Sequence, residues 1–129
     1  MARLRLFASL REAAGTGSIE IPGDTVEEVV AFPFPDPLAE GRYDDAAFYI
    51  EKYKHDYFIV GDMELTMFDM MQQLVGLEKL LVDMAQGAAY LEPLMDKCGD
   101  FALAVGVKRV SLGVDGIWAG DDFGAQNGM

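Results

Sequence analysis

The chain is poor in the residues that build metal centres and disulfides. Its 129 residues include one cysteine, Cys98, and one histidine, His55. A single cysteine excludes an internal disulfide and is typical of a reducing cytosol, so we expect a cytoplasmic protein. Zinc sites need at least three protein ligands, and we therefore expect no metal and no other cofactor. Cys98 belongs to an apolar helical stripe and should be a small core residue, whereas His55 should be exposed.

Basic residues are also scarce, with 10 Lys and Arg against 22 Asp and Glu and a net charge of −12. Such a surface repels the phosphate backbone of nucleic acids and the headgroups of anionic membranes, so we expect neither as a partner. No apolar run approaches the length of a membrane span. The first residues lack the apolar region of a signal peptide, and none is predicted.

What is present is an ordinary globular composition, 51% hydrophobic and 25% charged, in a length that suits one domain. In the first 30 residues, alternation predicts strands over 2–8 and 18–21. A helical turn capped by Ser9 is expected over 9–14. Thr25 should cap a helix that starts at Val26, with acidic residues in its first turn.

Three prolines between residues 33 and 37 prevent a helix from continuing, and we place a boundary in the stretch 31–37. The order after it is helix, strand, helix, helix, strand. These elements are expected over 43–53, 57–60, 65–84 (with a possible break near Gly76), 90–112 (possibly bent at Gly99 or Gly106) and 114–119. Gly113 should cap the last helix.

Apolar periodicity predicts which side chains of these elements are buried. The last strand should be buried, apart from Asp115, which we expect to accept from a neighbouring donor. The predicted core positions on the helices are Ala47, Ile50, Tyr53, Leu65, Phe68, Met71, Gln72, Leu77, Leu80, Leu81, Met84, Tyr90, Leu91, Leu94, Met95, Cys98, Phe101, Ala102 and Val105.

Strands joined by helical crossovers predict a parallel sheet, so the fold class is α/β. The strands predicted over 57–60 and 114–119 are each followed by Gly-Asp. This puts two acidic loops at the carboxyl edge of the sheet, where α/β proteins hold ligands. We assign candidate catalytic roles to Asp121 and Asp122, and candidate substrate-binding roles to Gly61, Asp62, Met63 and Gln126. The alternative is an ordinary solvated turn in which the two aspartates cap a helix or accept from backbone amides, and composition alone favours it.

The opening of the chain resembles the ubiquitin-like sulfur carriers, specifically the small subunit of molybdopterin synthase. The residues that carry this resemblance are RLRLFASLREAAG at 3–15 and IEIPGDTVEEV at 19–29. It implies that residues 1–31 are a truncated β-grasp segment. Members of that family act through a C-terminal Gly-Gly, whereas this chain ends in Gly128-Met129, so their activity is not expected here.

Residues 32–129 resemble the uroporphyrinogen decarboxylase superfamily, which includes the corrinoid-dependent methyltransferases. The residues that carry this resemblance are FPDP at 34–37, YFIVG at 57–61, LTMFD at 65–69, LVGLE at 74–78, GVDGI at 113–117 and GDDFGAQ at 120–126. It implies an internal fragment of a (β/α)8 barrel, the TIM barrel, with its site at the carboxyl-terminal mouth. The implied substrate is a porphyrinogen, or a methyl donor with a corrinoid protein. The implied reaction is a lyase step of porphyrin biosynthesis, or methyl transfer.

Three hypotheses follow. The first is a fragment of such an enzyme, inactive as an isolated chain, joined to a sulfur-carrier segment by nature, by sequence assembly or by design. The second is a binding or carrier protein without catalysis. The third is a small acidic α/β protein with no site. On the first hypothesis, a few strands leave both sheet edges and an apolar face open, so we expect self-association through the sheet edges.

Overall fold

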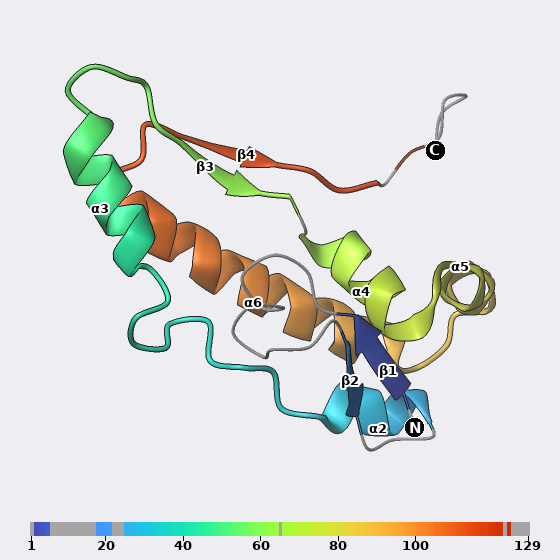
Figure 1. Cartoon of the computed structure of the whole chain (residues 1–129). Helices are drawn as coiled ribbons and strands as arrows, with labels where there is room; N and C mark the ends of the chain where they lie inside the picture. Colours follow the sequence, from blue (N-terminus) through green and yellow to red (C-terminus); the bar gives the residue numbers. More distant parts are fainter. Residues whose placement is uncertain (1, 6–17, 22–24, 65, 123, 125–129) are drawn as a thin grey trace. The chain divides into compact units, whose positions relative to one another are not determined.

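A computed structural model of the chain describes residues 2–5, 18–21, 25–64, 66–122 and 124 (Figure 1). Its contacts divide into two compact units. The first unit comprises Met1–Pro33 with Met70–Lys97, and the second comprises Phe34–Asp69 with Cys98–Met129. The first division falls in the proline stretch, and helices α4 (Met67–Val75) and α6 (Leu91–Ser111) run from one unit into the other.

The first unit begins with an antiparallel strand pair followed by a helix. Strand β1 (Ala2–Arg5) pairs with β2 (Ser18–Ile21), and Ala2 lies opposite Ile21. The predicted strand over 18–21 is confirmed, as is the start of the first. The remainder of that strand and the helical turn over 9–14 lie outside the described residues.

Helix α2 (Val26–Ala31) starts where Thr25 predicts. The Glu28 backbone N–H donates to Thr25 Oγ1 at 3.2 Å, and the Thr25 N–H donates to Glu28 Oε2 at 3.1 Å. This reciprocal capping box pairs two backbone donors that the helix itself leaves open. At the other end of α2, Lys97 Nζ donates to the carbonyls of Val30 and Phe32, which supplies a cation where the helix dipole favours one.

The rest of the first unit confirms the predicted helix break. Helix α4 ends at Val75 and α5 (Leu77–Gln86) begins after Gly76, whose φ of 93° is a backbone conformation that favours glycine. Met71, Leu80 and Leu94 are buried there. The prediction that the apolar face of α5 is buried is correct at Leu80 and wrong at the other three positions, because Leu77, Leu81 and Met84 are about half exposed.

The second unit contains helix α3 (Asp44–Tyr53), strands β3 (Val60–Met63) and β4 (Gly116–Ala119), and most of α6. Strands β3 and β4 are parallel, with Val60 opposite Gly116 and Met63 opposite Ala119 (Figure 1). This pairing confirms the predicted parallel sheet and the mixed α/β class. The described part of the structure contains two two-stranded sheets, one antiparallel and one parallel, together with helices. The agreement with the predicted architecture extends no further than this mixed α/β content.

The predicted limits of the first parallel strand are wrong by three residues. Tyr57 and Phe58 precede β3 and are 65% and 73% exposed, while Gly61 and Asp62 lie inside the strand instead of after it. The reason is the pairing with β4, which aligns with residues 60–63. A β-rich composition alone does not determine which residues of a segment pair with the neighbouring strand.

Helix α6 runs unbroken for 21 residues, so this segment is one helix and is not divided into two shorter helices at its glycines. Gly106 instead allows close approach to the sheet, since a Cβ there would lie 3.0 Å from Met63 Sδ. Gly113 ends the helix as predicted, with φ 93° and its N–H donating to the Val110 carbonyl at 2.9 Å. Cys98 is fully buried on α6, which confirms its role as a core residue. None of the described helices is long and apolar enough to cross a membrane.

The two faces of the β3–β4 sheet differ in cover. Gly61 and Met63 face α6, because a Cβ on Gly61 would meet Arg109 and Met63 lies against Gly106. Side chains alternate along a strand, so Val60 and Asp62 point to the other face. The described residues leave that face, which we call the bare face, largely uncovered: Val60 is 51% exposed and Trp118, opposite Asp62, is 53% exposed. The prediction that the last strand is buried is therefore wrong, since the described helices pack against only one side of the sheet.

The predicted core positions on the helices are confirmed only in part. Ile50, Phe68 and Ala102 of the second unit are buried as predicted. Ala47 and Tyr53 of the same unit, and Met95 of the first unit, are exposed. Leu65 lies outside the described residues. His55 is exposed in the turn after α3, as its position between charged residues predicts.

Candidate functional site

The carboxyl ends of β3 and β4 meet at one edge of the sheet, because the strands are parallel. The Gly120 N–H donates to the Met63 carbonyl at 3.4 Å and extends the contact beyond the strand ends. Asp121 and Asp122 follow directly. The structure therefore brings Gly61, Asp62, Met63 and both aspartates of the second loop to the same region of one unit, while Gln126 lies outside the described residues.

Asp121 holds the start of helix α4. Its Oδ2 accepts from Thr66 Oγ1 at 2.6 Å and from the Phe68 N–H at 2.8 Å, and its Oδ1 accepts from the Asp69 N–H at 2.9 Å. Phe68 and Asp69 are the second and third residues of α4, whose N–H groups have no partner within the helix. Asp121 is thus a helix cap supplied from a residue 53 positions along the chain. This is the capping alternative, although the helix precedes the aspartate in sequence instead of following it.

Asp122 and Asp62 are the carboxylates at this edge that remain open to solvent. Asp122 is exposed, and within the described residues no hydrogen bond or ion pair of its side chain is present. Asp62 is exposed on the bare face, directly opposite Trp118. The indole of Trp118 folds over Gly120, where a Cβ would lie 2.9 Å from the ring. Asp62 and Trp118 therefore place a hydrogen-bond acceptor beside an aromatic ring, and Asp122 adds a second exposed carboxylate four residues after Trp118 in the sequence.

Asp115 has the structural role that its position predicts. Its Oδ2 accepts from the Ile59 backbone N–H at 2.9 Å, and its Oδ1 pairs with Lys54 Nζ at 3.2 Å. The backbone hydrogen bond, followed by the one from Lys54, lowers the pKa of Asp115 below its ordinary value. The carboxylate therefore stays ionised at neutral pH and links the segment before β3 to the segment before β4.

A second polar cluster, in the first unit, had not been anticipated from the sequence. Lys79 Nζ and the Tyr90 hydroxyl both donate to Asp83 Oδ2. These donors lower the pKa of Asp83, while burial and the same hydrogen bond raise the pKa of Tyr90 far above its ordinary value. The Lys79–Asp83 spacing of four residues on a helix was the signal that could have found it. Both donors converge on one carboxylate oxygen, so the cluster fastens α5 to the segment before α6.

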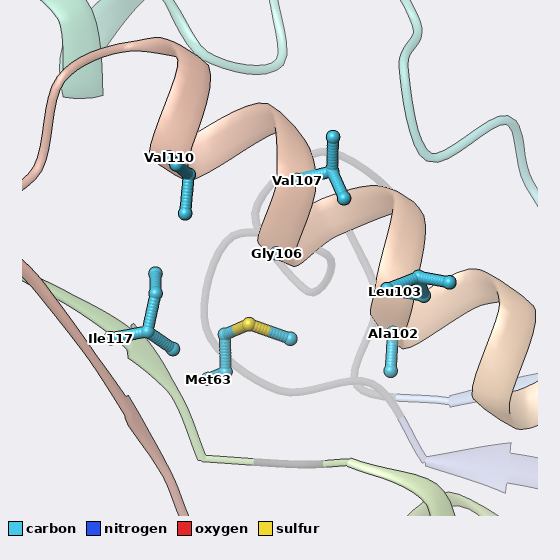
Figure 2. Close-up of a pocket in the computed structure, with 7 residues that line it drawn as sticks. All are labelled: Met63, Ala102, Leu103, Gly106, Val107, Val110 and Ile117. Carbon is cyan, nitrogen blue, oxygen red and sulfur yellow. The ribbon is translucent and has the colours of Figure 1, made fainter.

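An apolar groove lies between α6 and the helix-covered face of the sheet, with a volume of about 520 Å³. In Figure 2, Ala102 and Val110 of α6 are directed toward Met63 and Ile117 of the strands. The lining also includes Leu103, Gly106 and Val107, and none of these residues carries a polar side chain. The groove can hold apolar groups, but it contains no side chain that could do chemistry.

Metal ligands do not gather among the described residues, where no group of three or more His, Cys, Asp or Glu side chains could hold an ion. Comparison of the chain with protein-family models, with curated proteins and with solved structures finds no match. The site must therefore be interpreted from its own geometry.

Proposed function

We propose that residues 32–129 are a fragment of a (β/α)8 barrel of the uroporphyrinogen decarboxylase superfamily, and that the carboxyl edge of its sheet, with Asp62, Trp118 and Asp122, binds a cyclic tetrapyrrole. The observation that carries this proposal is the parallel β3–β4 pair with helices covering one face only. In a closed barrel, helices cover the outer face of such strands and the other face lines the interior. Val60, Asp62 and Trp118 would then be interior residues, and the acidic edge would belong to the mouth.

The exposed carboxylates suit that ligand. Pyrrole N–H groups and the side-chain amides of a corrin ring are donors, and the carboxylates of Asp62 and Asp122 offer acceptors. Each pyrrole ring of a porphyrinogen is flat and also matches the exposed indole of Trp118. In a decarboxylase these residues would position the porphyrinogen, and in a methyltransferase they would orient the corrinoid or the methyl acceptor. Asp121 would support the site by holding α4, and we expect the isolated chain to bind without turnover.

Trp118 provides the test, because it is the only tryptophan of the chain. Uroporphyrin, the stable oxidised form of the porphyrinogen, and hydroxocobalamin should each be titrated while Trp118 fluorescence and equilibrium dialysis are followed. We expect saturable quenching by one of them. Removing one charged acceptor, with Asp62→Asn, should weaken binding by about twofold to tenfold.

Asp56→Asn is the matched control, since Asp56 is exposed in the turn before β3 and carries the same charge. Uroporphyrin carries many carboxylates and the chain has a net charge of −12, so binding of hydroxocobalamin alone would favour methyl transfer over decarboxylation. The proposal fails if neither compound quenches saturably, or if Asp56→Asn weakens binding as much as Asp62→Asn.

The same geometry predicts self-association. Among the described strands, β3 and β4 pair only with each other, so each has one free edge, and their bare face exposes Val60 and Trp118. Free edges and exposed apolar faces are templates for pairing with another chain. Gel filtration with light scattering should give masses above that of the 14.1 kDa monomer. A single monomeric peak with cooperative urea unfolding would contradict this prediction.

A second proposal concerns residues 1–31 and is favoured by the antiparallel β1–β2 pair followed by α2. It is that this segment derives from a sulfur carrier and that the chain acts by partner contact instead of catalysis. Binding of the large subunit of molybdopterin synthase in calorimetry, together with no binding of either tetrapyrrole, would favour this alternative over the barrel fragment.

A further inference from the structure

A second pocket of the same unit lies on the helix-covered face of β3 and has a volume of about 300 Å³. Its walls come from three elements and are mainly apolar or aromatic. They include Tyr49 and Ile50 of α3, Ile59 and Gly61 at β3, Arg109 of α6, and Leu112 in the turn after that helix. Asp62 also contributes to the lining, but it is exposed to solvent.

Arg109 is the unusual member of this lining. Its Nη1 is buried and has no hydrogen-bond partner among the described residues. Gly61 lies beside the side chain, because a Cβ there would be in ordinary contact with Arg109 Cδ at 3.5 Å. The carboxylate of Asp115 is already occupied by Lys54 and by the Ile59 N–H. A buried guanidinium nitrogen without an acceptor is costly, and native structures nearly always pair such groups.

We propose that this pocket binds a small carboxylic acid with an apolar body, whose carboxylate pairs with the guanidinium of Arg109. One guanidinium matches one carboxylate in charge and in hydrogen-bond geometry. The walls beside it can cover an aliphatic or aromatic body, as in most small-molecule sites. A doubly charged phosphate fits less well, because Arg109 is the one cation that the described residues contribute to the lining. Gly61 faces this pocket and Asp62 points to the bare face, so this site is separate from the proposed tetrapyrrole surface.

Benzoate is the probe, with benzyl alcohol as its uncharged counterpart and inorganic phosphate as the competing anion. Saturation-transfer NMR titrations of the full chain should show saturable benzoate binding. The variant Arg109→Met keeps the length of the stem and removes the charge, and it should weaken benzoate binding by at least about tenfold. Arg42→Met is the matched control, because Arg42 is exposed in the turn before α3 and its loss changes the net charge equally.

If circular dichroism shows that Arg109→Met is unfolded, a second variant still tests the proposal. Ala46→Phe fills the pocket from α3 while Arg109 stays in place, and it should also abolish benzoate binding. The proposal is overturned if benzoate does not bind saturably, if benzyl alcohol or phosphate binds equally well, or if both variants bind benzoate like the unaltered chain. Asp122→Asn changes a residue of the proposed tetrapyrrole site that does not line this pocket, so it should leave benzoate binding unchanged. This separates the result from the fate of the tetrapyrrole proposal.

Discussion

Replacing Asp121 by alanine is expected to lower the free energy of unfolding by about 1–3 kcal/mol. The substitution removes the acceptor of the Phe68 and Asp69 N–H groups and of the Thr66 hydroxyl. These donors are partly buried, so water replaces the lost carboxylate incompletely, and the first turn of α4 loses the negative charge that its dipole favours. Urea unfolding followed by circular dichroism at pH 7 measures the loss.

The neighbouring aspartate supplies the control for this prediction. Asp122→Ala removes the same charge from the next position, but its side chain is exposed and bonds to none of the described residues. Its effect should stay within about 0.5 kcal/mol. Asp121→Asn, which keeps one acceptor oxygen, should fall between the two alanine variants. Equal losses for Asp121→Ala and Asp122→Ala would contradict the capping role and would point to net charge as the cause.

Arg109→Met is expected to have the opposite sign and to stabilise the chain by about 1–3 kcal/mol. The unpaired Nη1 is buried in the unaltered chain, so folding strips it of water without giving it an acceptor. Methionine retains an unbranched apolar stem against Gly61 and places no charge in the pocket. Thermal and urea unfolding in the absence of added anions provide the measurement.

The benzoate site adds a second readout to the same variant. Ligand at about one hundred times its dissociation constant stabilises a protein by about 2.7 kcal/mol, so benzoate should raise the unfolding midpoint of the unaltered chain and leave Arg109→Met unchanged. Arg42→Met should differ from the unaltered chain by no more than about 0.5 kcal/mol. A loss of stability on Arg109→Met would mean that the guanidinium makes a stabilising contact and that the buried nitrogen is not a cost.

The location of the candidate site could be predicted from the sequence, but the roles of its residues could not. Both Gly-Asp pairs could be found along the sequence, and a parallel sheet brings them to one region. The role of Asp121 depends on the N–H groups of α4, which lie more than 50 positions earlier and become its donors only after β3 and β4 have paired. Arg109 gave no signal, because an arginine near the end of a helix is common and its burial depends on α3 and β3.

The sequence by itself determined the features that act over a few residues. The capping of α2 by Thr25, the helix break at Gly76 and the helix end at Gly113 each follow from a hydrogen bond or a backbone angle that one residue type favours. The alternation of strands and helices likewise predicted the parallel pair. Tertiary structure alone decided the register that puts Asp62 inside β3, the exposure of Trp118 and the partners of Asp121 and Arg109. These properties depend on which element covers which face, and burial is a relation between distant segments that no local pattern contains.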